Sequence, residues 1–329
     1  MIPTLTAGQA LAECLDALEL QSWRDFDVVV VDNSGRGLVR RQEGHRAGVS
    51  ILENERNTGF GAAVNHGFRA SGAEFLATLN DDAVAGREWL AELMAAAEET
   101  PGCGMWASQI RLAGQGALDS AGLLLAADGS SKQRGHGRPP EEYARREETL
   151  LPSGCAALYR RRMLEETGLF DETFFLYCED TDLGLRGRWA GWDCLYVPQA
   201  VVEHHYSLSA GRASALKARY VERNRLFLVL KNFPAGMLWR VPVAAIERYW
   251  WHVAEMAAGR GAAGRFRGGG NSGLALAGYV LRAHWEALVH LRSLWRSRRE
   301  VRATARISPA EFRRLAARHS ISPREVAAQ

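Results

Sequence analysis

The sequence lacks the features of a membrane-spanning or secreted chain. Its 329 residues contain no run of about 18 apolar residues, and the most apolar late stretch, 274–281, is far too short to cross a bilayer. The N-terminus has no basic segment followed by an apolar one, so no signal peptide is expected. The five cysteines show no CxxC or Cys/His metal spacing, and their odd number favours a reducing, cytoplasmic compartment.

Aspartate is absent from residues 211–329, and this absence is one side of a charge asymmetry. Residues 1–210 carry 19 Lys and Arg against 31 Asp and Glu, a balance of −12, whereas residues 211–329 carry 22 against 7, a balance of +15. Five of the ten tryptophans also lie in the second segment. Arginine and tryptophan together favour contact with an anionic membrane surface, although a solvated basic face on ordinary helices has the same composition. No recognisable nucleic-acid-binding module is present, so no nucleic-acid partner is expected.

Alternating strand and helix patterns predict an α/β fold with a mostly parallel sheet and flanking helices. The β-branched run 26–31 is typical of a strand buried on both faces, and shorter strand patterns lie at 50–52 and 74–79. Apolar residues at helical spacing fill the intervals between these runs, which is the pattern of an α/β domain.

The second part of the chain predicts a helical extension. Helices are expected over 211–232, 236–258 and 271–297, with a Gly-rich break over 264–273 before the last. Two later Ser-Pro-x-Glu sequences, beginning at Ser308 and Ser322, predict short helices that open with capping boxes.

One segment of the first part, 128–149, is rich in turn residues. Its glycines and prolines predict either a mobile loop over the site or a disordered surface loop.

Two acidic clusters are the first candidates for chemistry. Asn80-Asp81-Asp82 follows a predicted strand, and adjacent carboxylates at a strand end can hold a divalent cation that bridges phosphates, although a polar turn has the same composition. Glu179-Asp180-Thr181-Asp182 opens a predicted helix, where the macrodipole favours acids in any case. A carboxylate beside the neighbouring aromatic residues could also serve as a general base.

Two further features give weaker signals. The Gly-rich segment 59–61 opens a predicted helix that could meet a phosphate or a sugar, but it is neither a dinucleotide fingerprint nor a P-loop. His204, next to His205, is either a metal ligand or a structural histidine.

Taken in order over residues 2–232, the motifs of this sequence resemble the family-2 glycosyltransferases, and within them the rhamnosyltransferase-like branch. The pieces are Ile2-Pro3-Thr4, 27–34, Asn57-Thr58-Gly59-Phe60-Gly61, Asn65-His66-Gly67, Leu79-Asn80-Asp81-Asp82, Ser153-Gly154-Cys155-Ala156, 168–172, 174–183, Arg186, Gly191-Trp192, Pro198 and His204. Each piece is weak, but the ordered series is specific. Two departures are a first strand that is shorter than usual and Thr4-Leu5-Thr6 in place of the family's Thr-Tyr-Asn.

The resemblance implies a glycosyltransferase-A catalytic domain over 1–210 and a helical, basic C-terminal extension over 211–329. Within the domain, about 1–110 would bind the nucleotide and about 111–210 the acceptor. The implied reaction is an inverting transfer of a rhamnose-like or other hexose from a nucleoside-diphosphate sugar. The acceptor would be a saccharide or a polyprenyl-linked saccharide in cell-envelope polysaccharide synthesis, reached from the cytoplasm or peripherally at the inner membrane face. The alternative is a degenerate, non-catalytic sugar-nucleotide-binding protein.

The resemblance also assigns roles to single residues. It makes Asp180 the catalytic base with Glu179 beside it, and Asp82 and His204 the ligands of Mg²⁺ or Mn²⁺. The expected donor-binding residues are Thr4, Asp32 (on the nucleotide base), Asn33, Asn57, Gly59, Asn65, Asn80 and Asp81 (near the ribose or the metal). The expected acceptor-binding residues are Gly154, Cys155 and Asp182, and the cations considered for the diphosphate are Arg219, Arg223 and Arg225.

Overall fold

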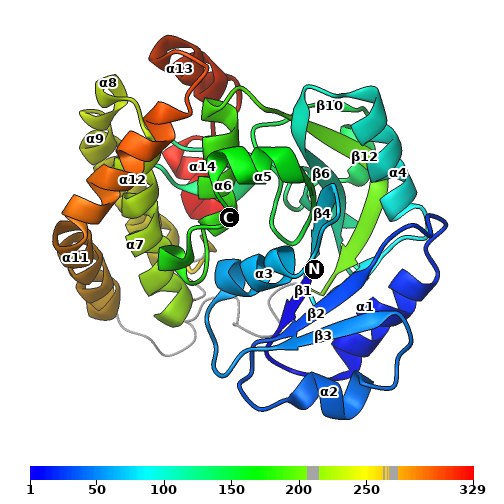
Figure 1. Cartoon of the computed structure of the whole chain (residues 1–329). Coiled ribbons are helices and arrows are strands. Elements are labelled where there is room, and N and C mark those ends of the chain that lie inside the picture. The colour runs from blue at the N-terminus through cyan, green and yellow to red at the C-terminus, as the bar shows by residue number, and fades with distance from the viewer. Residues whose placement is uncertain (206–214, 262–263, 265, 267–272) are drawn as a thin grey trace.

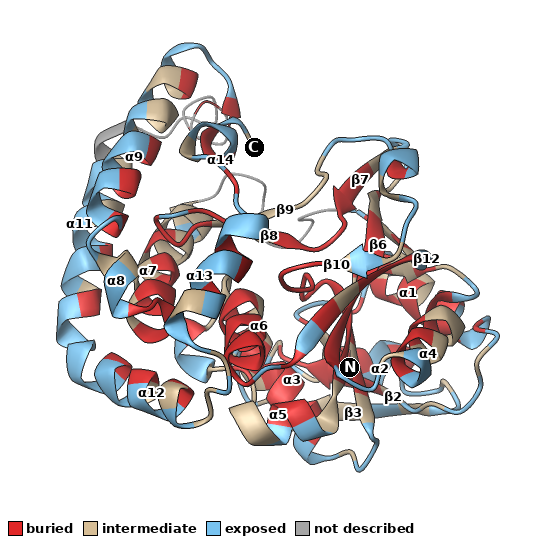
Figure 2. Ribbon diagram, turned by 90° about the horizontal axis from the view of Figure 1, so that it is seen from above, coloured by how far each residue is buried: buried red, intermediate tan, exposed pale blue. Residues whose placement is uncertain are grey.

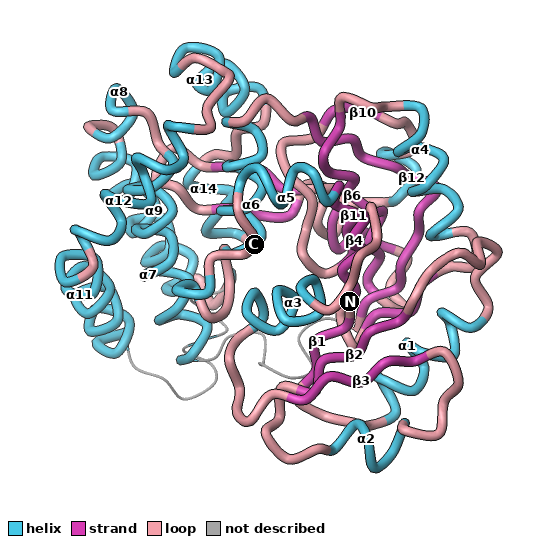
Figure 3. Tube along the Cα trace, in the orientation of Figure 1, coloured by secondary structure: helices cyan, strands magenta, loops and turns pink. Residues whose placement is uncertain are grey.

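The computed structural model describes the chain except for residues 206–214, 262–263, 265 and 267–272 (Figure 1). Strands gather on one side of the molecule and the C-terminal helices on the other (Figure 3). Two helices were predicted to begin at residues 211 and 271, and both of these positions lie outside the described residues. Most of the predicted Gly-rich break also lies outside them.

The N-terminal part forms a three-stranded parallel sheet in the order β1, β2, β3. The strands are β1 (Ile2–Thr4), β2 (Val28–Asp32) and β3 (Val49–Glu53), and the helices that connect and cover them are α1 (Gln9–Glu19), α2 (Leu38–Glu43) and α3 (Phe60–Arg69). Most of β2 is buried, as its valine run predicts. The Met1 carbonyl accepts a hydrogen bond from the Leu79 N–H at 3.1 Å, so β1 also runs beside β4 of the second sheet.

A second sheet of seven strands follows, with the central order β10, β12, β6, β11, β4 and with β5 on β12 and β7 on β6. Its strands are β4 (Phe75–Leu79), β5 (Ala83–Ala85), β6 (Cys103–Leu112), β7 (Ala117–Ser120), β10 (Glu147–Glu148), β11 (Ala156–Arg160) and β12 (Asp193–His204). The helices of this part are α4 (Trp89–Glu99), α5 (Arg161–Thr167) and α6 (Glu179–Trp189). The β6–β12 pair is parallel and the remaining pairs are antiparallel, so the expected parallel arrangement describes the first sheet and the second is mixed.

The segment predicted as a loop contains regular structure. A hairpin of β8 (Leu123–Leu125) and β9 (Ser131–Gln133) turns at Gly129, which adopts φ +90°. A Cβ at that position would lie 2.2 Å from the Val229 side chain, so the glycine lets the hairpin approach α7 closely. A 3₁₀ turn (Pro140–Tyr143) and β10 follow. The loop prediction is therefore wrong for these stretches, because contacts with other elements order a turn-rich sequence.

The C-terminal helices pack against α6 and the β8–β9 hairpin. They are α7 (Ala215–Asn232), α8 (Ala235–Leu238), α9 (Val241–Ala257), α11 (Gly273–Val289), α12 (Leu291–Ala303), α13 (Pro309–Arg318) and α14 (Pro323–Ala328). The predicted helix over 271–297 is interrupted at His290, whereas the capping boxes at Ser308 and Ser322 are confirmed. Trp189 of α6 stacks on Phe312 with 4.4 Å between the ring centroids, and both residues belong to one cluster of buried apolar side chains. Figure 2 shows buried stretches on α6 and α7. None of the described helices combines the length and apolar character that a membrane crossing requires.

Candidate active site

A cavity of about 920 Å³ brings the two acidic clusters to one site. It lies where β1 and β4 end and where α6 begins, and its wall continues along α7, α9 and α11. Most of the residues expected at the site line it: Thr4, Asn33, Asn57, Gly59, Asn80, Asp81, Asp82, Gly154, Cys155, Glu179, Asp180 and His204. The ends of strands from two sheets therefore converge on one cavity, as open α/β folds commonly arrange.

The first acidic cluster sits in the turn after β4. The Thr4 hydroxyl at the end of β1 lies 2.5 Å from Oδ2 of Asp81, and the N–H of Asn80 donates to the Cys155 carbonyl at 2.8 Å. Burial raises the pKa of Asp81 to about 6, an effect that the adjacent charge of Asp82 reinforces and the Thr4 hydrogen bond opposes. The short first strand thus supplies the threonine that fixes Asp81.

Asp82 belongs to a line of three side chains from different elements. Nε2 of His204, the last residue of β12, lies 3.1 Å from Oδ1 of Asp82, and Nδ1 of His204 lies 2.7 Å from Oδ2 of Asp119 on β7. Burial disfavours the imidazolium, but the Cys155 sulfur and the hydrogen-bonded carboxylates of Asp119 and Asp82 outweigh it, so the pKa of His204 lies well above its usual value. The two carboxylates hold the imidazole in a fixed orientation between them.

Asp119 was not expected from the sequence. It is 3% exposed and lines the cavity, and its second oxygen lies 3.2 Å from Nδ1 of His136. Hydrogen bonds from His136 and His204 outweigh the effect of burial and lower the pKa of Asp119. An isolated aspartate in a four-residue strand carries no motif, and only the pairing of β6 with β7 and β12 brings it to His204.

The chemistry of these side chains fits a divalent cation with two protein ligands. A carboxylate oxygen of Asp82 and Nε2 of His204 face each other, and the other ring nitrogen of His204 is held by a carboxylate, the usual second partner of a metal-bound histidine. Within the described ranges, no cluster of three or more His, Cys, Asp and Glu side chains is arranged to hold a metal. Mg²⁺ commonly takes one or two carboxylates and completes its coordination with substrate phosphates and water.

The second acidic cluster opens α6. Asp180 is half-buried, and its carboxylate accepts hydrogen bonds from the Gly154 N–H at 2.9 Å and the Thr181 N–H at 2.6 Å. Burial raises the pKa of Asp180, and these hydrogen bonds oppose the shift. A Cβ at Gly154 would lie 3.2 Å from the Asp180 Cβ, so the glycine permits this close approach. Asp180 is thus positioned at the cavity wall by backbone groups.

Glu179 is in a different environment from Asp180. Its side chain is buried, and its Oε2 atom has no hydrogen-bond partner among the residues that the structure describes. Burial, together with the neighbouring charge of Asp180, raises the pKa of Glu179 to about 8. With this pKa, the Glu179 carboxyl favours its protonated form at neutral pH.

The backbone ahead of α6 is strained. Phe175, Tyr177 and Cys178 have φ between 62° and 70°, a conformation that non-glycine residues seldom adopt outside functional sites. The Nδ2 atom of Asn224, a fully buried α7 residue, lies 2.7 Å to 2.8 Å from the carbonyls of Phe174, Leu176 and Tyr177. Asn224 thus supports the conformation that presents Asp180, and no sequence motif points to this role.

Gly59 holds the same loop from the other side. It has φ +91°, and a Cβ there would lie 2.1 Å from the Phe175 carbonyl oxygen, which itself accepts the Phe60 N–H at 2.9 Å. Asn33 and Asn57 fix the glycine turn, since the Asn57 side chain accepts hydrogen bonds from the Gly59 N–H and from Asn33. The Asn-Thr-Gly-Phe motif therefore joins the end of β2 to the loop ahead of α6.

Three expected site residues lie outside the cavity wall, so the cavity gives no support for their assignment as ligand-binding residues, which stays a prediction. Asp32 is 1% exposed and accepts the N–H groups of Ser34 and Val39, both at 2.9 Å, so it fixes the start of α2. Asn65 uses both ends of its amide on the backbone of Phe170, at 2.8 Å and 3.1 Å. These buried polar groups are occupied by the protein itself, which leaves them a positioning role.

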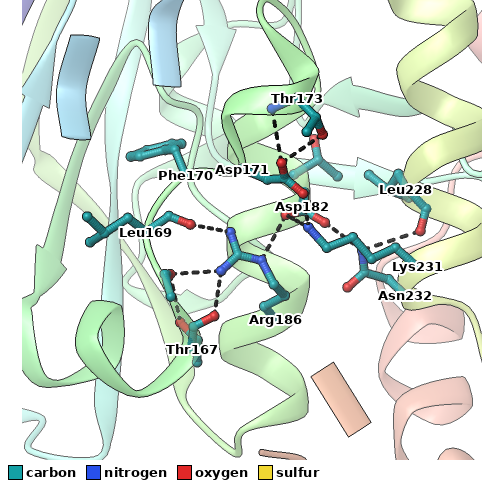
Figure 4. Close-up of polar contacts among 12 residues, drawn as sticks. Thr167, Leu169, Phe170, Asp171, Thr173, Asp182, Arg186, Leu228, Lys231 and Asn232 are labelled. Atoms are coloured by element: carbon teal, nitrogen blue, oxygen red, sulfur yellow. Dashed lines mark hydrogen bonds and ion pairs between the residues drawn. The ribbon is translucent and has the colours of Figure 1, made fainter. Parts of the chain in front are cut away.

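Asp182 is the third of these residues (Figure 4). It is fully buried and accepts hydrogen bonds from Arg186 at 2.8 Å, Lys231 at 2.9 Å and Asn232 at 2.8 Å. Two residues along a helix correspond to a rotation of about 200°, so Asp182 points away from the cavity that Asp180 faces. It ties α6 to α7.

The cations considered for a diphosphate are also occupied. Arg219 and Arg223 pair with Glu286 of α11, and Arg225 is held by Glu222 and by the Asp128 carbonyl. Of the three, Arg225 lines the cavity, as do two lysines, Lys132 and Lys217.

Comparison with known proteins finds a family model and curated relatives that match this sequence. The sequence model described as Glycosyl transferase family 2 matches residues 1–168. A curated relative from Mycobacterium tuberculosis, named N-acetylglucosaminyl-diphospho-decaprenol L-rhamnosyltransferase, is 31% identical over 266 residues, which cover 73% of this chain and 85% of the relative.

Two solved structures resemble the whole arrangement. GalNAc-T7 with UDP, GalNAc and Mn²⁺ superposes with a TM-score of 0.60 at 18% identity, over 75% of this chain and 49% of that one, so this chain spans about half its length. A mannosyltransferase from Pyrobaculum calidifontis in complex with GDP-Man and Mn²⁺ superposes with a TM-score of 0.52 at 19% identity, over 92% of this chain and 84% of that one. At these identities the likeness shows a shared fold.

Proposed function

The chain belongs to glycosyl transferase family 2 and has the glycosyltransferase-A fold, and on this basis we propose that it is an inverting enzyme acting on a lipid-linked saccharide. That it is a glycosyltransferase follows from its family. The donor in this proposal is a nucleoside-diphosphate sugar of the rhamnose type, and the acceptor is an amino sugar on a polyprenyl diphosphate. The name of the mycobacterial relative supports this donor and this acceptor.

One observation carries the proposal: a single cavity is lined by the Asp82–His204 pair at one side and by Asp180 at the other. Asp82 and His204 are the residues that would hold Mg²⁺ or Mn²⁺, with donor phosphates and water completing the coordination. When bound, the ion stabilises the charge that develops on the leaving nucleoside diphosphate. Asp119 would keep one proton of His204 on Nδ1, and the ion would take the place of the second proton, which the imidazolium carries on Nε2.

Asp180 is the proposed base. The acceptor hydroxyl oxygen forms a bond to the anomeric carbon while the bond from that carbon to the diphosphate oxygen breaks, and the hydroxyl proton passes to Asp180. A single displacement of this kind inverts the anomeric centre. Burial, which raises the pKa of Asp180, makes its carboxylate a stronger base than an exposed one.

The remaining cavity residues divide between the two substrates. Thr4, Asn33, Asn57, Gly59, Asn80 and Asp81 are proposed for the donor, and Gly154 and Cys155 for the acceptor, with Glu179 beside Asp180. The basic charge of residues 211–329 supports a peripheral position on an anionic membrane. The five free cysteines support a cytoplasmic one, at the inner membrane face.

The test begins with a thermal-shift series of nucleoside diphosphates with and without Mn²⁺. One nucleotide should raise the Tm selectively and only with the metal, because a ligand that binds the folded state stabilises it. Sugars on that nucleotide are then offered with N-acetylglucosaminyl diphosphate lipids, and the product is identified by mass and anomeric configuration. A product with retained configuration, or selective nucleotide binding without transfer to any lipid-linked saccharide, would contradict the proposal.

A further inference from the structure

Helix α9 carries its bulky apolar residues on the outside. Its exposed apolar residues follow one another at helical spacing and are 58% to 68% exposed; they are Val243, Ile246, Trp250 and Val253. The buried residues of the helix are Val241 at its start and, beyond it, the small and charged residues Ala244, Ala245, Arg248 and Glu255. A helix that met only water on its outer side would have the reverse pattern.

Helix α11 repeats this arrangement. Leu281, Trp285 and Leu288 of α11 are 64% to 73% exposed, whereas Ala283 and Ala287 face inward. Among the described residues, the exposed large apolar side chains other than Leu5 and Leu20 all lie in the C-terminal helical part: Leu216, Trp239, Val243, Ile246, Trp250, Val253, Leu281, Trp285, Leu288, Val289, Leu291 and Trp295. An apolar concentration of this kind marks an interaction surface.

The helices that carry these residues share one flank of the molecule. In Figures 1 and 2, α9, α11 and α12 lie along the side opposite the β-strands, and α8 lies on the same side. We refer to the exposed side chains of α8, α9, α11 and α12, including Trp239 at the end of α8, as the outer face.

The charge of the outer face identifies what covers it. Its exposed arginines are Arg240, Arg282, Arg292, Arg296 and Arg299, against two exposed glutamates, Glu247 and Glu300. The Arg240 guanidinium lies over the Trp239 ring at 4.9 Å. A second copy of the chain would bring the same positive charge against itself. Tryptophan and arginine beside aliphatic residues are instead the composition of a surface that lies at the boundary of an anionic bilayer.

The cavity of the active site reaches this face. Its wall includes Val253 and Met256 of α9 and Leu276, Val280 and Leu281 of α11. Val253 and Leu281 belong both to the cavity wall and to the outer face, so the cavity opens between these two helices. The residues at the opening, Val253 and Leu281, are apolar, whereas Arg248 and His252 of α9 line the same cavity, as do Asp82 and Asp180.

We propose that the outer face lies on an anionic lipid bilayer and that the apolar opening between α9 and α11 receives the hydrocarbon chain of the acceptor from that bilayer. The inference rests on the proposed function for the identity of the acceptor, whereas the docking of the face on lipid stands without it. In this arrangement the chain of the acceptor stays among apolar side chains while its saccharide reaches Asp180.

The first experiment measures co-sedimentation of the full chain with vesicles. Vesicles of phosphatidylglycerol and phosphatidylcholine should bind it at least tenfold better than phosphatidylcholine alone, and high salt should weaken the binding. A variant with Ile246→Ser, Trp250→Ser and Trp285→Ser should lose at least tenfold in binding, and one with Arg292→Gln, Arg296→Gln and Arg299→Gln should lose its preference for the anionic lipid. Leu20→Ser, which removes an equally exposed leucine from the other side of the molecule, should bind as the unaltered chain does.

Two outcomes of that experiment would overturn the proposal. One is equal binding of the unaltered chain and the serine variant to anionic vesicles, or no binding by either at low salt. The other is a dimer of the unaltered chain in sedimentation that the serine variant converts to a monomer, because this would assign the face to a second copy.

The second experiment compares transfer to a water-soluble, short-chain acceptor with transfer to the same saccharide on a long polyprenyl chain in vesicles. The substituted residues do not line the cavity, so the serine variant should keep its rate on the short-chain acceptor and lose at least tenfold on the vesicle-bound one. Equal losses on both would indicate a structural defect and contradict the proposal. If the unaltered chain transfers sugar to neither acceptor while still binding vesicles, the proposed function fails and the docking face stands.

Discussion

The two acidic clusters look alike in sequence but occupy opposite electrostatic surroundings. Oδ1 of Asp82 lies beside one ring nitrogen of His204, and Asp119 contacts the other ring nitrogen. Glu179 and Asp180 meet the dipoles of backbone N–H groups and apolar side chains, and burial raises the pKa of both. The first arrangement suits a ligand for a cation, and the second suits a group that accepts a proton. Neighbouring groups, and not the acids themselves, separate the two tasks.

The backbone conformation also differs between the two acidic clusters. The first cluster follows a strand and is held by Thr4 and the Cys155 carbonyl. The second follows three residues with positive φ that Asn224 and Gly59 keep in place. Strain is thus concentrated on the side of the proposed base, where a small displacement would alter the position of Asp180.

The largest expected effect comes from Asp180→Asn. The amide keeps the shape of the side chain and the hydrogen bond from the Gly154 N–H but cannot take the acceptor proton, so kcat should fall by about 10² to 10⁴-fold. Nucleotide binding, measured by thermal shift with Mn²⁺, should be unchanged because the Asp82 side is intact. Transfer at the unaltered rate would remove the distinction between the clusters.

Asp182→Asn should act on stability instead. Asp182 is buried between Arg186 and Lys231, and neutralising it leaves Arg186 without its carboxylate partner and Lys231 with Asp171 alone, at a cost of about 3 kcal/mol in the free energy of unfolding. Chemical denaturation measures this change, and kcat per folded molecule should be retained. Asp193→Asn is the matched control, since Asp193 also pairs with an arginine but is largely exposed and should change the stability little. A larger loss in Asp193→Asn than in Asp182→Asn would contradict this account.

Asp119→Asn tests the support behind His204. Removing this charge should weaken Mn²⁺-dependent nucleotide binding by about 10 to 100-fold, because a carboxylate on Nδ1 orients the imidazole and makes it a better ligand. A Mn²⁺ titration of the thermal shift at a fixed nucleotide concentration measures the effect. Asp16→Asn, at an exposed acid, provides the control. Equal metal dependence in Asp119→Asn and the unaltered chain would show that His204 needs no such support.

The smallest expected effect is the pH dependence of Glu179→Gln. In the folded chain Glu179 keeps its proton to about pH 8, whereas the unfolded chain releases it near the ordinary pKa of 4.5, so stability falls as pH rises between these values. Glutamine does not titrate, and the variant should therefore gain stability relative to the unaltered chain from pH 5 to pH 8. The gain should exceed about 1.4 kcal/mol, the equivalent of one pKa unit.

Denaturation at several pH values measures this gain, with the exposed Glu141→Gln as control. A difference between the two chains that does not change with pH would mean that Glu179 is ionised in the folded protein.

Much of the fold was predictable from local pattern. The valine run of β2, the strand ahead of Asn80 and the capping boxes at Ser308 and Ser322 are each specified by neighbouring residues. The ordered motifs also predicted the family, because their sequence along the chain is specific even though each piece is weak. The β8–β9 hairpin, which extends into 128–149, was missed. It packs against α7, about 100 residues later in the sequence, and a local pattern cannot show that contact.

The sequence alone thus determined the order of elements, the family and the segments that meet at the cavity. Only the tertiary structure decided which carboxylates face it: Asp180 does and Asp182 does not, because helix geometry turns them to opposite sides. It also brought Asp119 to His204 through strand pairing, and it directed the apolar residues of α9 and α11 outward. Composition fixes how much charge and apolar surface a chain has, but the direction of each side chain depends on partners that lie far away in the sequence.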